Sequence, residues 1–169
     1  MAEAGARERF AGLLAQHRGI VVKVAHTFAA SAEDRADLAQ EIAAQLWRSF
    51  PRYDASRPFA TWMYRVALNV GVSYLRGRER RGVAEPLDAE SVASQTSPDE
   101  SLEDARRAHA LERAIARLAR LDRALLLLHL DERSQREIGE VLGISESNVA
   151  TKLSRLRQRL RGELSGGKS

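Results

Sequence analysis

Aromatic rings and arginines are concentrated in one short part of the chain. Seven of the nine Phe, Trp and Tyr residues lie between Trp47 and Tyr74, and the arginine-rich sequence RGRERR follows at residues 76–81. Aromatic faces stack on unpaired bases, while arginines hold the phosphate backbone. The segment therefore contains candidates for binding single-stranded DNA: Tyr53, Trp62, Tyr64 and Tyr74. The alternative is that the rings form a core, and we expect Phe50 and Phe59 to be buried.

A second basic group lies in the sequence SQREIGEVLGISESNVATKLSRLRQRLR, residues 134–161. The apolar spacing predicts two helices, 135–142 and 146–161, separated by a tight turn. Gly143 can take the positive φ that such a turn needs, and Ser145 can cap the second helix. The pattern therefore predicts a helix-turn-helix.

The two faces of the second helix differ in character. Gly139 lets the two helix backbones approach closely. In the second helix, apolar residues spaced four, three and four apart must face inward: Val149, Leu153, Leu156 and Leu160. Residues 150–161 include five basic residues and no acidic one. The opposite face carries side chains that suit the major groove of DNA: Asn148, Thr151, Lys152, Arg155 and Arg159. A solvated basic face is the alternative, but the turn chemistry and the charge together favour DNA docking.

The composition changes between these two groups. The sequence GVAEPLDAESVASQTSPDES, residues 82–101, has two prolines, many small polar residues and no apolar periodicity, which is typical of a linker. Residues 82–105 contain no Lys or Arg and seven acidic residues: Glu85, Asp88, Glu90, Asp99, Glu100, Glu103 and Asp104. One interpretation is a solvated tether, and the other is a strand of negative charge that occupies a groove built for nucleic acid.

Helical periodicity covers most of the remaining chain. Helices are expected over four stretches: 8–29, 34–50, 59–81 and 102–131. Pro51 ends the second of these because it lacks an amide hydrogen, and Pro58 keeps the residues before it extended. The sequence thus predicts an all-α protein with two small helical domains joined by a flexible acidic linker: 5–81, the linker 82–104, and 105–163.

The composition also excludes several classes of protein. The chain has no cysteine and its four histidines show no paired spacing, so we expect no catalytic residue, metal or cofactor. Charges run through the first residues, and no segment approaches the roughly 20 apolar residues of a membrane span, so we expect a cytoplasmic protein without a signal peptide. The net charge of +4 and the pI near 9.9 indicate an anionic partner.

The tail suggests an enzyme of another class. The sequence GELSGGKS, residues 162–169, satisfies the phosphate-loop pattern G-x-x-x-x-G-K-[ST]. That loop needs a strand before it and a helix after it, whereas here a helix is expected before it and the given sequence then stops. We therefore do not expect nucleotide binding.

The pattern as a whole resembles the extracytoplasmic-function (ECF) sigma factors of bacterial RNA polymerase. The segment DLAQEIAAQLW (37–47) is similar to the D-x-x-Q-E segment of that family, and PFATWMYRVALN (58–69) is similar to its F-x-x-W-L-Y-R-I-A-x-N segment. The sequence RLDRALLLLHLDERSQREIGEVLGISESNVATKLSRLRQRL (120–160) is similar to its minus-35-reading C-terminal domain. The resemblance runs through nearly the whole chain and implies a transcription initiation factor rather than an enzyme.

The resemblance also implies roles for individual residues. One helix would grip the clamp helices of the polymerase β′ subunit through Asp37, Gln40, Glu41 and Trp47. Capture of unpaired minus-10 bases would involve the loop 52–59 together with Tyr53, Trp62, Asn69, Ser73, Arg76 and Arg80. The C-terminal domain would contact the β flap and read minus-35 duplex DNA through Asn148, Thr151, Lys152, Arg155 and Arg159. The linker would thread towards the active-site cleft, and an anti-sigma factor is a further partner that the family allows.

Two positions depart from the family pattern. An Asp commonly lies four residues after the Asn, where this chain has Ser73, and the residue after the recognition-helix Val is often basic, where this chain has Ala150. Both departures bear on the preferred promoter sequence, which cannot be read from the chain.

The competing interpretation is a stand-alone helix-turn-helix regulator. It explains residues 110–161 but gives no purpose to the D-x-x-Q-E helix, the aromatic block or the acidic linker.

Overall fold

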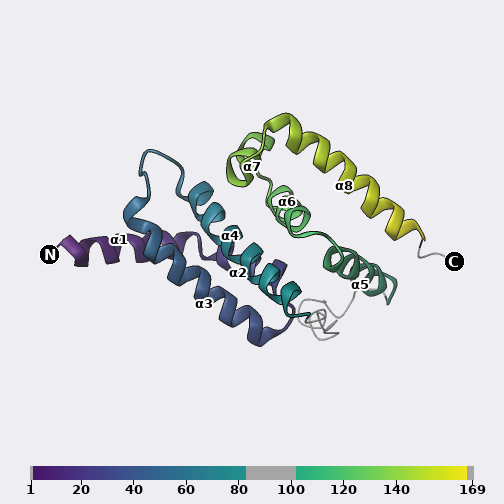
Figure 1. The fold of residues 1–169 in the computed structure, drawn as a ribbon, viewed down its shortest axis with the longest axis horizontal. Helices are drawn as coiled ribbons and strands as arrows, with labels where there is room; N and C mark the ends of the chain where they lie inside the picture. The colour runs from purple at the N-terminus through teal and green to yellow at the C-terminus, as the bar shows by residue number, and fades with distance from the viewer. Residues whose placement is uncertain (1, 83–101, 167–169) are drawn as a thin grey trace.

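The computed structural model describes residues 2–82 and 102–166, and its elements in these ranges are helical (Figure 1). They are α1 (Ala2–Gln16), α2 (Arg18–Phe28), α3 (Ala32–Ser49), the 3-10 turn η1 (Phe50–Arg52), α4 (Phe59–Arg80), α5 (Leu102–Ala116), α6 (Arg120–Leu130), α7 (Gln135–Leu142) and α8 (Glu146–Gly166). The predicted all-α fold with two helical domains is confirmed. Most of the predicted linker lies outside the described residues. Each helix in the described ranges is too short or too polar to span a bilayer.

Two of the predicted helical stretches are each divided in the structure. The stretch expected as one helix over 8–29 breaks at His17, whose φ of −115° and ψ of 16° depart from helical values. The stretch expected over 102–131 ends at Ala116 and resumes at Arg120. The prediction of one helix over 8–29 was wrong, and the periodicity over 102–131 did not reveal the second break, because apolar residues continue through each interruption.

Six aromatic rings gather where α1, α3, η1 and the start of α4 meet: Phe10, Trp47, Phe50, Tyr53, Phe59 and Trp62. Phe50 and Phe59 are buried, as the sequence predicts, while Tyr53 and Trp62 are half-buried and lie 5.0 Å apart between ring centroids. We call this group the aromatic cluster. It explains most of the aromatic concentration as packing that supports the loop between η1 and α4.

The helix-turn-helix forms as the sequence predicts. Gly143 has a φ of 71°, and the Ser145 hydroxyl accepts a hydrogen bond from the Asn148 amide at 3.2 Å. A Cβ placed on Gly139 would lie 2.7 Å from the Ile144 carbonyl oxygen, so this position tolerates glycine alone. Three members of the apolar stripe in α8 are buried, and the fourth, Leu160, is half-buried.

The second group of helices, α5–α8, packs against the first group, α1–α4, through α6 and α7. Helix α6 contacts α2 and α4, and α7 contacts α4, whereas α8 lies on the outer side of the molecule (Figure 1). The buried side chains of both groups form one continuous cluster that includes Val24 on α2, Met63 on α4 and Leu128 on α6. The two predicted domains therefore pack against each other through a side-chain interface, in addition to being parts of one polypeptide.

Candidate nucleic-acid interface

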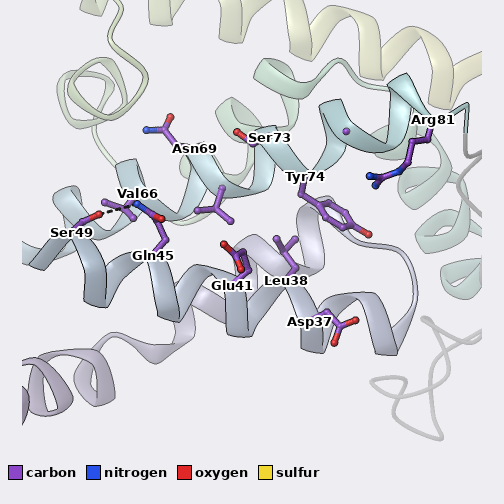
Figure 2. Close-up of a pocket in the computed structure, with 12 residues that line it drawn as sticks. Asp37, Leu38, Glu41, Gln45, Ser49, Val66, Asn69, Ser73, Tyr74 and Arg81 are labelled. Atoms are coloured by element: carbon purple, nitrogen blue, oxygen red, sulfur yellow. Dashed lines mark hydrogen bonds between the residues drawn. The ribbon is translucent and has the colours of Figure 1, made fainter.

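A groove runs between α3 and α4, and Figure 2 shows the side chains that line it. From α3 it receives Asp37, Leu38, Glu41, Gln45 and Ser49, and from α4 it receives Val66, Asn69, Val70, Ser73, Tyr74 and Gly77, with Arg81 just beyond that helix. Its polar residues on α3 recur every four positions, so they lie along one face of that helix. The groove thus has an acidic and amide wall on one side and a mixed polar and apolar wall on the other.

The groove brings together residues that the sequence assigns to two different partners. Asp37 and Glu41, the candidate polymerase contacts, are exposed on α3, and Asn69 and Ser73, the candidate base contacts, are exposed on α4. The two pairs lie far apart in sequence and share a groove only because α3 packs against α4. Exposed polar groups of this kind retain their hydrogen-bonding capacity for a partner.

Local contacts leave Glu41 accessible. Arg48 Nη2 donates to Glu41 Oε1 at 3.1 Å, but both side chains are more than half exposed, so the pair is screened by solvent and contributes little. Gln45 Nε2 donates to Ser49 Oγ at 3.1 Å along the same wall (Figure 2). These contacts orient the α3 wall without closing it.

A second ion pair ties the two walls together. Arg78 on α4 donates to Asp34 on α3 at 3.2 Å, and its side chain is only 15% exposed. The same guanidinium lies over the Tyr74 ring, 5.8 Å from the centroid. The Arg48–Glu41 pair lies within α3, whereas the partly buried Arg78–Asp34 pair joins α4 to α3 and loses less to screening.

Other predicted contact residues lie outside the groove. Gln40, Arg76 and Arg80 are exposed on the outer faces of α3 and α4. Trp47, Tyr53 and Trp62 belong to the aromatic cluster. The structure therefore divides the predicted contact residues between an open groove, exposed flanks and a packed support.

The prediction for Tyr64 is wrong for this conformation. Its side chain is fully buried, at 0% exposure, and its hydroxyl donates to the Asp131 carboxylate. Burial, followed by this hydrogen bond, raises the pKa of Tyr64. A ring in this position cannot present its face to a base, and the sequence did not reveal this because Asp131 is distant along the chain.

The loop between η1 and α4 is held by its own side chains. Tyr53 Oη donates to the Arg57 carbonyl at 2.8 Å, and Asp54 accepts from both the amide and the hydroxyl of Ser56, at 2.9 and 2.7 Å. Hydrogen bonds from the Ser56 hydroxyl and amide lower the pKa of Asp54. The loop is thus a defined turn rather than an unstructured connection, and its residues 54–58 are exposed.

Helix α8 presents its candidate DNA contacts on one exposed face. Asn148, Thr151 and Arg155 are exposed, and Lys152 is half-buried. Among the described residues, Arg155 has no acidic side chain within 4.0 Å, so its charge is available to a phosphate. This is the arrangement that the helical spacing predicts.

Two exposed basic residues of α8 contact other side chains of the protein. Arg159 lies 3.4 Å from Glu163 and 4.0 Å from Asp122 on α6, and Arg157 lies 3.1 Å from His129 Nε2. Arg159 is 49% exposed, so it can still reach a phosphate, although acidic neighbours offset part of its charge.

The sequence missed several residues of the groove and one outside it. Gln45, Ser49 and Arg81 line the groove, and a four-residue spacing from Glu41 would have indicated the first two. Asp131 receives hydrogen bonds from side chains far away in sequence, and no local pattern announces it.

Comparisons with known proteins agree with this geometry. Residues 13–81, which include the α3–α4 groove, match the family model of sigma-70 region 2, and residues 108–160, which include most of α8, match that of sigma-70 region 4. The ECF sigma factors SigW and SigE are among its relatives, and the chain belongs to the ECF subfamily of sigma-70 factors. Figure 1 then shows region 2 as α1–α4 and region 4 as α5–α8.

Individual relatives match nearly the whole length of this chain. The chain is 25% identical over 173 residues to the ECF RNA polymerase sigma factor SigW of Bacillus subtilis, and the match covers 95% of this chain and 91% of the relative. It is 31% identical over 155 residues to the ECF sigma factor SigE of Mycolicibacterium smegmatis, covering 90% of this chain and 60% of the relative. The solved structure of CnrH in complex with the cytosolic domain of CnrY matches with a TM-score of 0.67 and 26% identity, covering 98% of this chain and 96% of that one.

Proposed function

We propose that this sigma factor binds core RNA polymerase and directs it to specific promoters as an alternative sigma. The observation that carries this proposal is the α3–α4 groove, where exposed Asp37 and Glu41 lie opposite exposed Asn69 and Ser73. A groove of this composition lets one domain hold a protein partner on one wall and DNA on the other. The chain would act in the cytoplasm, where polymerase and promoter DNA meet.

Polymerase binding is assigned to α3. Asp37, Gln40 and Glu41 form an exposed polar edge suited to the clamp helices of the β′ subunit. Trp47 supports this edge from the aromatic cluster, where its ring lies 5.2 Å from that of Phe10. Region 4 would contact the β flap, so that both domains are placed on one enzyme.

Capture of minus-10 bases is assigned to α4 and the loop before it. Asn69 and Ser73 would hydrogen-bond an extruded base, with Tyr53 and Trp62 holding the loop in shape. Arg76 and Arg80 are exposed further along α4 and would hold phosphates. The free energy needed to extrude one base is a few kcal/mol, and stacking it on a ring returns about 1–3 kcal/mol.

The free energy of promoter opening shows why a partner is needed. A bubble of about a dozen base pairs costs roughly 1.4 kcal/mol per stacking step, far more than one or two captured bases return. The isolated protein should therefore open no promoter, whereas the holoenzyme should. The position on the DNA at which the holoenzyme binds would be set by side chains of α8 that read the minus-35 duplex: Asn148, Thr151, Lys152, Arg155 and Arg159.

A regulatory protein is a further proposed partner. The CnrH structure contains the cytosolic domain of CnrY. We propose that an anti-sigma factor likewise binds this chain and competes with polymerase for region 2.

Abortive transcription with purified core polymerase tests the proposed function. We expect short transcripts from a cognate promoter only when both core polymerase and this protein are present. The promoter is found first by sequencing transcripts after overexpression. A promoter that stays closed with the complete pair contradicts the proposal, and duplex binding that persists without any polymerase binding would favour the stand-alone regulator.

A further inference from the structure

The boundary between the two regions contains a buried polar contact centred on one carboxylate. Asp131 follows α6, and its side chain is only 15% exposed. It accepts from Lys23 Nζ on α2, from Tyr64 Oη on α4 and, within its own region, from Arg133 Nη2 at 3.3 Å. Two of its three donor residues thus belong to region 2, so these two protein contacts exist only when the regions are docked.

The hydroxyl of Tyr64 reaches across the boundary from the packed core of region 2 to Asp131. Its ring is fully buried on α4, where a phenylalanine would fill the same volume. Within the described part of the chain, the hydroxyl bonds Asp131. The Arg133 guanidinium carbon lies 5.4 Å from the centre of the same ring, which adds a cation–π contact from region 4. Separation of the regions would expose the ring and leave its donor to water.

Weaker contacts extend the same boundary. Arg120 at the start of α6 lies 3.6 Å from Glu79 near the end of α4, with the two side chains 34% and 53% exposed. A pair this exposed contributes little to stability. The contact at Asp131 and the apolar packing of α6 therefore contribute more than the Arg120–Glu79 pair to holding the regions together.

The docked arrangement conflicts with binding both promoter elements. Elements named for positions 35 and 10 are separated by about 25 base pairs, or roughly 85 Å of straight duplex at 3.4 Å per base pair. A compact chain of 169 residues has a radius of gyration of roughly 15 Å, or a diameter of about 40 Å. Two regions in direct contact cannot reach both elements at once.

We propose that Asp131, with Lys23 and Tyr64, forms a latch that keeps the free protein closed, and that the latch must open before both promoter elements are bound. The effect of the latch on promoter binding rests on the proposed function, whereas the closing contact itself does not. The closed state reduces the fraction of molecules competent for promoter binding, and polymerase binding supplies the free energy that opens the latch.

The absence of cysteine permits a direct measurement of the latch. Ala36→Cys on α3 and Ala108→Cys on α5 place one dye on the exposed surface of each region, and energy transfer between them reports closure. We expect Asp131→Asn and Tyr64→Phe to shift the ratio of closed to open molecules about ten-fold towards open. The matched control is Glu132→Gln, which removes the same charge from the neighbouring exposed residue and should leave the ratio unchanged.

Two readouts separate failure of the latch from failure of the proposed function. Energy transfer needs no polymerase, and if Asp131→Asn, Tyr64→Phe and Lys23→Ala all behave like the Glu132→Gln control, the latch is refuted. Where one variant fails to fold, as judged by circular dichroism, the other two decide. In the second readout, Tyr64→Phe should bind core polymerase up to about ten-fold more tightly than the parent. If a variant is open but binds core polymerase no more tightly than the parent, latch opening is not coupled to polymerase binding. If the parent does not bind core polymerase at all, only the proposed function is contradicted.

Discussion

In the α3–α4 groove the candidate contact residues come from two helices, whereas in α8 they come from one. Asp37 and Glu41 reach the groove from α3 and Asn69 and Ser73 from α4, while the minus-35 candidates share one exposed face. The groove therefore depends on packing between helices, but the α8 face depends only on the helix itself and on the turn that presents it. Damage to packing should affect the groove widely, and single substitutions on α8 should act locally.

The largest expected effect is on polymerase binding. Replacing Asp37, Gln40 and Glu41 together with alanine should weaken binding to core polymerase by at least about 100-fold, or about 2.7 kcal/mol, because the exposed edge of α3 is lost. Duplex DNA binding by α8 should be unchanged. The measurement is fluorescence anisotropy with labelled protein against each partner.

The control for this variant removes two exposed charges from α5, through Glu103→Ala and Glu112→Ala. It should bind polymerase as the parent does. If the α3 variant keeps its affinity for polymerase, the groove is not the docking surface.

Substitution of one glycine in each region compares how tightly the two regions are packed. A Cβ on Gly139 would lie 2.7 Å from the Ile144 carbonyl oxygen, and one on Gly71 would lie 2.7 Å from a ring carbon of Phe28. Backbone yields less than a side chain, so Gly139→Ala should lower the free energy of unfolding by about 3 kcal/mol and Gly71→Ala by about 1–2 kcal/mol. Urea unfolding measures both.

Gly12→Ala is the matched control, since no atom lies within 4 Å of a Cβ there. In α1 it should raise stability by a few tenths to about 1 kcal/mol. Equal losses for Gly71→Ala and Gly139→Ala would show that the core under Phe28 is as rigid as the turn backbone.

A smaller effect is expected on α8. If about five phosphates are neutralised, the slope of log affinity against log salt should be on the order of −4 to −5. Arg155→Ala should weaken duplex binding several-fold and reduce that slope by about one. Arg106→Ala, an exposed position on α5, is the control and should change neither value. An unchanged slope for Arg155→Ala would remove this residue from the phosphate contacts.

The smallest effect is the pH dependence of the latch. Burial alone would raise the pKa of Asp131, but hydrogen bonds from Lys23 and Tyr64 and the charges of Lys23 and Arg133 outweigh it, so the pKa lies below its usual value of 3.8. The carboxylate therefore stabilises the closed state fully above about pH 4, and this stabilisation is lost as the pH falls through the lowered pKa.

Energy transfer measured between pH 2.5 and pH 6 tests this sign. The parent should open more towards the acidic end of that range than Asp131→Asn, which lacks the titrating group. Identical profiles for the two proteins would show that Asp131 does not titrate in the latch.

Much of the helix-turn-helix was predictable because its determinants are local. Gly143, Ser145 and the apolar stripe of α8 act within a few residues of one another, so their spacing specifies turn, cap and buried face together. The breaks at His17 and after Ala116 were not predictable from apolar spacing, which continues through both. The ring of Tyr64 looked available for stacking because its sequence neighbours include Trp62 and arginines.

The amino-acid sequence by itself determined that the chain is helical, which side of α8 is exposed and basic, and which family the chain belongs to. Only the tertiary structure decided which aromatic rings are packed together, which residues of α3 and α4 share a groove, and that Asp131 meets Lys23 and Tyr64. The physical reason is the separation in sequence between the residues that interact. A helical face follows from a repeat of 3.6 residues, whereas a contact across 67 residues depends on how whole helices pack.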